Sequence, residues 1–225
     1  FDVLARTITV TGASDINGIL NINGSGVLDA NGAFDATSGS ITMDGTARLQ
    51  VAGTVTSLGT LDELAGTVEY DGGTQDVLAD AYYNLEIDES GVKTSQGTVT
   101  AAGTLTVGSG ATYAIAATTT TVTGNSDING AFTASTGEYD ADGAFDATGG
   151  SITFSGAGEL RVSGTVTSLG ALGTSAGSIE YDGGTQNVLA DAYYNLEIAE
   201  SGVKTAQGTV TAAGTLTVGS GATYA

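Results

Sequence analysis

Four short acidic motifs hold the residue types best suited to binding a metal ion. Each reads Asp-x-Asn/Asp-Gly, so two oxygen-bearing side chains alternate before a glycine. Hard oxygen ligands at alternate positions suit Ca²⁺, and the pattern is half of a calcium-binding loop. The third oxygen position and the distal glutamate are missing, so the pattern also predicts a strand corner in which Asp caps the turn and Asn or Gly takes positive φ. The candidate calcium ligands are Asp15, Asn17, Asp29, Asn31, Asp127, Asn129, Asp140 and Asp142.

Neighbouring carboxylates offer a second kind of chemistry. Glu69 lies two residues before Asp71, and Asp88 precedes Glu89. Paired carboxylates act as acid and base in glycoside hydrolysis. In the second copy of this segment, however, Ala199 replaces Asp88, and few basic residues are present to hold an acidic sugar. We therefore expect a solvated acidic face, with no catalytic residues, no organic cofactor and no enzyme activity.

Two tyrosine pairs and two lysines recur at equivalent positions. Tyr82-Tyr83 and its copy at 193–194 suggest a sugar-stacking strip. Adjacent strand residues point to opposite faces, so we expect one tyrosine of each pair in the core and one at the surface. Lys93 and Lys204 follow Glu-Ser-Gly, which predicts a local ion pair with the glutamate; a lysine–asparagine isopeptide bond is the alternative.

The composition excludes several classes of protein. The 225 residues include no Cys and no His, which removes disulfides, thiolate metal sites and histidine-based catalysis. With 5 Lys plus Arg against 25 Asp plus Glu, the net charge is −20, so nucleic acid and anionic membrane surfaces are excluded as partners. No run of about 18 apolar residues is present to insert into a bilayer.

An internal repeat organises the elements that carry these residues. Residues 66–114 and 177–225 align without a gap at an offset of 111 and differ at only five positions. Upstream segments match at offsets of 111 and 112, and Phe1 falls in the same phase as Tyr113 and Tyr224. The predicted organisation is a first unit at 1–112, a second at 113–223 and the start of a third at 224–225.

Short alternating segments dominate each unit. Runs such as Thr7–Thr11, Arg48–Val51 and Asn84–Ile87 place aliphatic residues on one face and Thr or charge on the other, which is typical of half-buried strands. Residues 60–65 are the only helix-like run, and Asn-Gly, Asp-Gly and Gly-Gly pairs mark the corners. The strands are short, the corners are closely spaced and Pro and Trp are absent, which favours a parallel β-solenoid of five or six coils per unit over tandem Ig-like β-sandwiches.

A family resemblance follows from two strings. Tyr-Asp-Gly-Gly-Thr-Gln-Asn-Val-Leu-Ala-Asp-Ala-Tyr-Tyr-Asn-Leu-Glu-Ile at 181–198 and Gly-Thr-Val-Thr-Ala-Ala-Gly-Thr-Leu-Thr-Val-Gly-Ser-Gly-Ala at 208–222 resemble repeats of large secreted bacterial surface proteins. These are the filamentous-haemagglutinin-like and adhesin-type parallel β-helix proteins. The resemblance implies an all-β solenoid and an extracellular or cell-surface location.

These observations lead to one expectation about function and one alternative. We expect a structural segment of an extracellular fibre, filament or adhesin stalk that associates head to tail, or continues in a longer array, through stacked coils. The alternative is a β-helix that binds or degrades carbohydrate, with a surface glycan as its partner. Calcium is the one cofactor that the motifs suggest.

Overall fold

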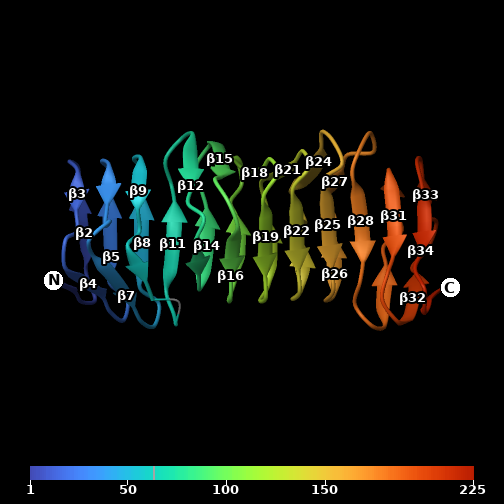
Figure 1. The fold of residues 1–225 in the computed structure, drawn as a ribbon, viewed down its shortest axis with the longest axis horizontal. Helices are drawn as coiled ribbons and strands as arrows, with labels where there is room; N and C mark the ends of the chain where they lie inside the picture. The colour runs from blue at the N-terminus through green and yellow to red at the C-terminus, as the bar shows by residue number, and fades with distance from the viewer. Residues whose placement is uncertain (63) are drawn as a thin grey trace.

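The chain forms a parallel β-solenoid of about 11 turns in a computed structural model that describes residues 1–62 and 64–225. Figure 1 shows the strands stacked along one axis, with the two termini at opposite ends. Most strands pair in parallel with the strand three places later, as β2 does with β5 and β5 with β8. The predicted solenoid is confirmed, and the β-sandwich alternative is wrong because the ladders run between successive turns in parallel.

Three strands make up each turn, so the strands fall into three faces. Face 1 holds β1 (Asp2–Val3), β4 (Ile19–Ile22), β7 (Ser40–Met43), β10 (Thr60–Leu61), β13 (Ala81–Tyr82), β16 (Val99–Ala101), β19 (Thr119–Val122), β22 (Glu138–Ala141), β25 (Glu159–Val162), β28 (Ser178–Tyr181), β31 (Asn195–Ile198) and β34 (Leu216–Val218). Face 2 holds β2 (Thr7–Val10), β5 (Val27–Ala30), β8 (Arg48–Val51), β11 (Thr67–Tyr70), β14 (Asn84–Ile87), β17 (Leu105–Val107), β20 (Ser126–Ile128), β23 (Phe145–Asp146), β26 (Val166–Ser168), β29 (Gln186–Val188), β32 (Gly202–Ala206) and β35 (Ala222–Tyr224). Face 3 holds β3 (Ser14–Asp15), β6 (Phe34–Asp35), β9 (Val55–Ser57), β12 (Gln75–Val77), β15 (Gly91–Ser95), β18 (Ala111–Ile115), β21 (Ala131–Ala134), β24 (Ser151–Phe154), β27 (Ala171–Leu172), β30 (Ala192–Tyr193) and β33 (Thr211–Ala212).

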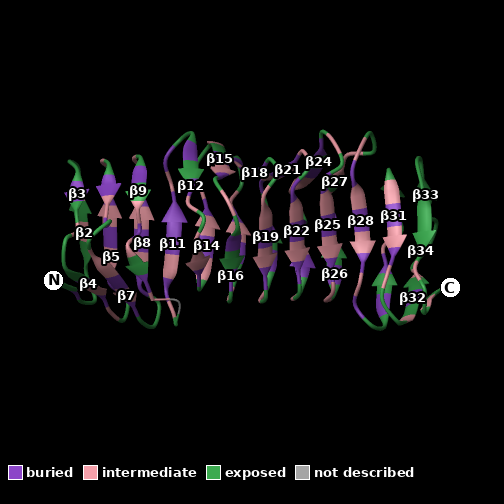
Figure 2. Ribbon diagram, in the orientation of Figure 1, coloured by how far each residue is buried: buried purple, intermediate pink, exposed green. Residues whose placement is uncertain are grey.

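Alternation along each strand fills the interior of the coil. In β8, Leu49 and Val51 are fully buried while Arg48 and Gln50 point outward, the period-2 pattern of a pleated strand. Figure 2 shows the same alternation on many strands of the rod. Although the sequence contains few aromatic residues, several of them lie in the interior: the largest fully buried side chains include six tyrosines. The helix-like run at 60–65 begins as strand β10, and its residue Glu63 lies outside the described residues.

Close stacking of the coils explains the glycine of the acidic motifs. A Cβ on Gly32 would lie 2.2 Å from the carbonyl oxygen of Gly12 in the preceding turn, and one on Gly130 would lie 2.3 Å from that of Gly108. Among the described residues other than glycine, only Glu89 and Glu200 have positive φ. The expectation of positive φ at the Asn or Gly of these motifs is therefore wrong, and at Gly32, Gly130 and Gly143 the glycine is required by the spacing between coils.

One turn in each unit departs from regular pairing. Thr67 of β11 pairs with Asn84, whereas Val27 of β5 pairs with Arg48, so the turn that follows β11 is shorter than the turn that follows β5. In this short turn, β8, β11 and β14 pair continuously, but within the described part of the chain β9 does not pair with β12 and β10 does not pair with β13. The second unit repeats the break, between β26 and β29 and between β27 and β30.

The sequence repeat does not contain a whole number of turns. β28 is the repeat equivalent of β11 and comes 17 strands later, so with three strands to a turn each unit advances by five and two-thirds turns. β11 accordingly lies on face 2 and β28 on face 1. Equivalent residues of the two units are therefore displaced by one face around the rod.

Candidate functional site: two carboxylate ladders

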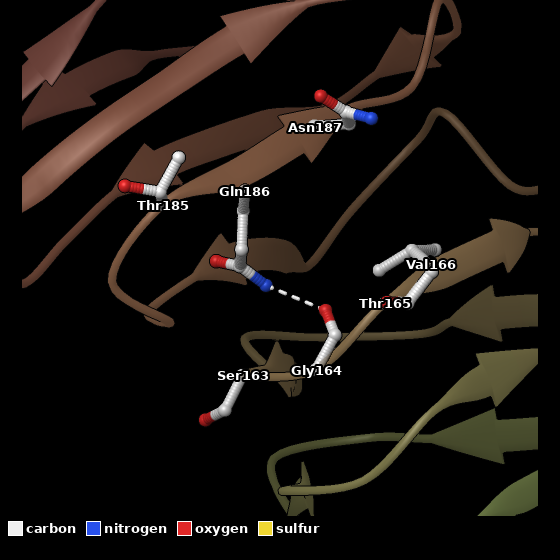
Figure 3. A pocket seen from close by; sticks show the side chains of 7 residues that line it. All are labelled: Ser163, Gly164, Thr165, Val166, Thr185, Gln186 and Asn187. Carbon is white, nitrogen blue, oxygen red and sulfur yellow. Dashed lines mark hydrogen bonds between the residues drawn. The ribbon is translucent and has the colours of Figure 1, made fainter.

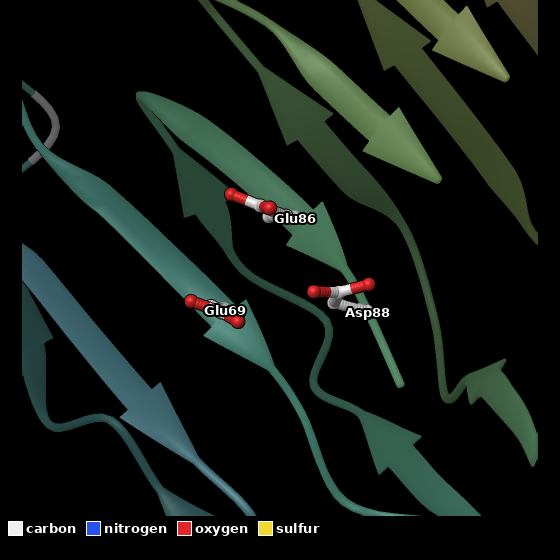
Figure 4. A group of neighbouring side chains, drawn as sticks. All are labelled: Glu69, Glu86 and Asp88. Atoms are coloured by element: carbon white, nitrogen blue, oxygen red, sulfur yellow. The ribbon is translucent and has the colours of Figure 1, made fainter. Parts of the chain in front are cut away.

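The first unit places its carboxylates in a row across successive turns of face 2. In the strand register, Asp29 pairs with Gln50, Gln50 with Glu69, and Glu69 with Glu86. Asp71 and Asp88 follow the ends of β11 and β14 and extend the row sideways. We call Asp29, Glu69, Asp71, Glu86 and Asp88 the unit 1 ladder; Figure 4 shows three of its members on neighbouring strands.

A single arginine neutralises part of the unit 1 ladder. Arg48 forms ion pairs with Glu69 and, at 2.6 Å, with Glu86. Gln50 adds a hydrogen bond from its Nε2 to Glu69 at 2.9 Å. Glu69 is 5% exposed, so its charge is held by these two donors rather than by water. Although burial lowers the pKa of Arg48, the two glutamates raise it overall.

The second unit has the same row on face 1, with its arginine moved two residues along the strand. The sequence Arg-Leu-Gln-Val at 48–51 becomes Glu-Leu-Arg-Val at 159–162. Arg161 contacts Glu138 at 3.1 Å, Glu180 at 3.5 Å and Asp182 at 2.9 Å. We call the following residues the unit 2 ladder: Glu138, Asp140, Glu159, Glu180, Asp182 and Glu197.

The displaced arginine gives Asp71 and its repeat equivalent Asp182 different surroundings. Asp182 accepts hydrogen bonds from Arg161 at 2.9 Å and from Ser163 at 2.8 Å. In contrast, Oδ1 of Asp71 is buried without a hydrogen-bond partner among the described residues. Burial, together with the nearby charge of Glu69, raises the pKa of Asp71 to about 6. The same position is therefore satisfied in one unit and electrostatically unfavourable in the other.

Each ladder contains a group of carboxylates with the spacing of a cation site. Oxygens of Glu69, Glu86 and Asp88 lie within 4.8 Å of one another. Those of Glu159, Glu180 and Glu197 do the same in the second unit. Burial and neighbouring carboxylates raise the pKa of Glu180 to about 7 in spite of Arg161. The chemistry of both groups is therefore that of concentrated negative charge that attracts protons or hard cations.

The predicted calcium motifs lie at strand corners and do not converge. Within three of them the Asn donates its side-chain amide to the Asp at 2.8 Å: Asn17 to Asp15, Asn31 to Asp29, and Asn129 to Asp127. The fourth motif has Asp142 in place of Asn, and burial followed by this second carboxylate raises the pKa of Asp140. Asp29 and Asp140 belong to the two ladders, whereas Asp15 lies on face 3. Calcium binding by the motifs stays a prediction.

The two repeated lysines are buried, and the predicted ion pair with a glutamate carboxylate is wrong. Lys93 is 0% exposed, and its Nζ donates to the backbone carbonyls of Asp88 and Glu89, the latter at 2.7 Å. Lys204 is equally buried and binds the carbonyls of Ala199, Glu200 and Ser201. Burial lowers the pKa of both lysines. Each ammonium satisfies corner carbonyls that turn inward, and no asparagine amide is among these partners.

The tyrosine pairs divide as predicted between core and surface. Tyr82 is buried, and its hydroxyl donates to Leu78 O at 2.9 Å and lies 3.0 Å from the hydroxyl of Tyr70. Tyr83 is 38% exposed. Tyr193 and Tyr194 repeat this arrangement in the second unit. The exposed members lie singly, one per unit and one face apart, so they do not form the sugar-stacking strip.

An open groove marks the interrupted turn of each unit. In the second unit it has a volume of about 320 Å³ and is lined by Ser163–Val166 and Thr185–Asn187 (Figure 3). The equivalent groove at 52–55 and 74–76 has a volume of about 450 Å³. Gln186 crosses the break and donates its amide to Val162 O at 2.8 Å and to Gly164 O at 2.9 Å. The lining therefore offers hydroxyl and amide groups.

The two carboxylate ladders cannot be predicted from the sequence alone. Glu69 and Asp71 are recognisable as a pair, and so are Asp88 and Glu89, but the cluster takes Asp88 from one pair and leaves out the exposed Glu89. The available signal is the spacing between Glu69 and Glu86, which recurs unchanged between Glu180 and Glu197. That spacing becomes meaningful only when the length of the short turn is known.

The comparisons with known proteins add no constraint on the site. No protein-family model, curated protein or solved structure matches the chain. Among the described residues, no helix is long and apolar enough to span a membrane.

Proposed function

We propose that the chain is a structural segment of an extracellular fibre, filament or adhesin stalk that assembles end to end. The observation that carries the proposal is the C-terminal coil, whose interior residues are uncovered. Leu216 and Val218 are 51% and 47% exposed, whereas their equivalents Leu105 and Val107 are 0% exposed (Figure 2). Uncovered apolar residues and strand edges of a solenoid coil are satisfied when another coil stacks on them, either from a second chain or from the continuation of a longer array.

The side of the rod supports the same proposal. It carries the two carboxylate ladders and a net charge of −20, so rods repel one another laterally and remain soluble. Association along the axis then meets less opposition than association side to side. Location at the cell surface and the absence of catalysis belong to the proposal. The family resemblance of the repeats supports the location, and the lack of His and Cys supports the absence of catalysis.

Electron microscopy combined with sedimentation velocity tests the function. Eleven turns at about 4.8 Å each give a single rod about 50 Å long. We expect rods whose length increases with protein concentration in steps of about this size at constant width. Discrete particles of one length at every concentration would contradict the proposed assembly.

Binding of a surface glycan is the second candidate, and the groove repeated in both units favours it. Hydroxyl and amide groups line both copies, as Thr54, Thr74 and Gln75 do in the first unit, and Asp76 adds a carboxylate in that unit alone. A glycan array followed by titration of the Thr74→Val variant tests this candidate. Binding that is weakened by Thr74→Val and unaffected by the variant Thr112→Val, outside the groove, would support it. The absence of any bound glycan would exclude it.

A further inference from the structure

At the boundary between the two units, one coil is covered by the next in the way that the exposed C-terminal coil is not. We call this coil-to-coil contact the joint. Residues 84–114 are covered by the coil at 116–134, through the pairs β16–β19 and β17–β20. Residues 195–225 differ from 84–114 only at positions 199 and 206, and residues 4–22 match most of 116–134. The chain thus has a second copy of each half of this interface, one at each end of the rod.

We propose that the C-terminal coil binds the N-terminal coil of a second copy of this chain in the register of the internal boundary. This inference rests on the proposed function and specifies its partner and geometry. Internally, Thr106 pairs with Asp127, and Val107 with Ile128. Transposed to the ends, Thr217 pairs with Asp15 of the second copy, and Val218 is covered by Ile16 of that copy.

Two glycines of the N-terminal coil provide independent support. Gly12 and Gly18 have no atom of the described residues within 4 Å of an added Cβ and do not have positive φ. Their equivalents are tightly constrained, because a Cβ on Gly124 would lie 1.9 Å from Gly103 O, and one on Gly130 would lie 2.3 Å from Gly108 O. The proposed joint places the same carbonyls, those of Gly214 and Gly219, against Gly12 and Gly18. A second copy therefore supplies the contact that requires these two glycines.

The apolar surfaces of the two ends are complementary in the same register. Ile8, Val10 and Ile16 are only partly buried, although Val122 and Ile128, the equivalents of the last two, are fully buried. In the register of the internal boundary, Ile8 and Val10 would lie against Val210 and Ala212, and Ile16 would lie against Val218. Leu216 would be covered by Ser14, as Leu105 is by Ser126. Burial of apolar area at about 25 cal/mol per Å² drives such contacts.

The joint requires a small exchange of residues. Tyr224 and Ala225 hold the same positions in the repeat as Phe1 and Asp2, so in the joint both pairs would occupy the same place against β4 of the second copy. One of the two pairs must therefore be displaced. Phe1 is 70% exposed, whereas Tyr113, at the same position of the boundary, is fully buried. We therefore assign the displacement to Phe1 and Asp2, with Tyr224 then lying beside Leu20 of the second copy.

Engineered disulfides test the register directly, because the chain has no cysteine. In the variant Thr217→Cys/Asp15→Cys the two thiols lie at opposite ends of one rod, so any disulfide joins two chains. We expect oxidation to give a series of covalently linked multimers. Thr106→Cys/Asp127→Cys is the matched control, since it reproduces the same pair within one chain and should give a monomeric disulfide. Thr217→Cys/Asn17→Cys shifts the register by two residues, about 6.6 Å along the strand, and should not form covalent multimers.

Glycine variants test the contact without disturbing the fold of the single rod. Gly12→Ala/Gly18→Ala should keep the melting temperature of the monomer and weaken association at least tenfold, as measured by sedimentation in 1 M NaCl, where the Debye length is about 3 Å. Gly124→Ala/Gly130→Ala should instead lower the melting temperature. Two results would overturn the register but not the proposed assembly. The first is a parent chain that associates although Thr217→Cys/Asp15→Cys forms no cross-link, and the second is full affinity in Gly12→Ala/Gly18→Ala. A parent chain that stays monomeric would overturn both.

Discussion

Asp71 and Asp182 occupy one position of the repeat, and neutralising them should change stability in opposite directions. Asp71 has a buried oxygen without a hydrogen-bond partner in the described part of the chain, and burial followed by the charges of Glu69, Asp29 and Glu89 raises its pKa. Asp182 holds Arg161 and Ser163. Asp71→Asn therefore removes an unfavourable charge, whereas Asp182→Asn removes a favourable one.

The magnitude for Asp71 follows from its pKa, which rises from 3.8 to about 6. At 1.36 kcal/mol per pKa unit this shift corresponds to about 3 kcal/mol, and solvent screening of a half-buried carboxylate reduces it to about 1 kcal/mol. The folded state binds the proton more tightly than the unfolded chain does, so stability falls as pH rises from about 4 to about 6. The gain from Asp71→Asn should therefore be absent near pH 4 and complete at pH 7.

Thermal unfolding from pH 4 to 8 measures both variants. For a chain of this length, 1 kcal/mol shifts the melting temperature by about 2–4 °C, so Asp71→Asn should raise it by that amount at pH 7. Asp182→Asn loses a charged hydrogen bond and should lower stability by about 1–2 kcal/mol at pH 7. A gain for Asp71→Asn that persists at pH 4, or the same sign for both variants at pH 7, would refute the electrostatic reasoning.

Three further predictions follow from contacts described above. Lys93→Met leaves buried corner carbonyls without a donor and should lower the free energy of unfolding by about 2–4 kcal/mol, whereas Arg6→Met on the exposed first coil should change it little; equal effects in denaturant unfolding would contradict the role of Nζ. Tyr82→Phe removes the bonds to Leu78 and Tyr70 and should cost about 1 kcal/mol, while Tyr83→Phe should be neutral by thermal unfolding. Millimolar CaCl₂ should increase light scattering through the carboxylate ladders, and NaCl at equal ionic strength should not; equal scattering in both salts would exclude specific cation bridging.

The solenoid was predictable because alternation and corners are local properties. Strands such as Arg48–Val51 and Asn84–Ile87 carry both the period-2 pattern and the predicted inward faces. The same logic fails at Lys93, where alternation favours Val92 as the inward residue. Val92 is 39% exposed and Lys93 is buried, because the ammonium must reach carbonyls that the corner turns inward. A local pattern does not contain that requirement.

The ladders could not be predicted, because they depend on turn lengths. Glu69 meets Glu86 across the short turn, whereas Val27 meets Arg48 across a longer one. A sequence reading that assumes one coil length places these side chains out of register. The exchange of Gln50 for Arg161 at the same repeat position is visible in the sequence, but its effect on Asp71 and Asp182 appears only with their neighbours.

The 17 strands of the repeat determine how charge is arranged around a longer rod. Since 17 is not a multiple of three, successive units place their ladder on successive faces, and the pattern returns to its first face after three units. At about 4.8 Å per turn that distance is about 80 Å. The acidic stripe therefore winds around the axis, and cations can bridge neighbouring rods in three directions. Such rods would gather into three-dimensional bundles rather than flat ribbons.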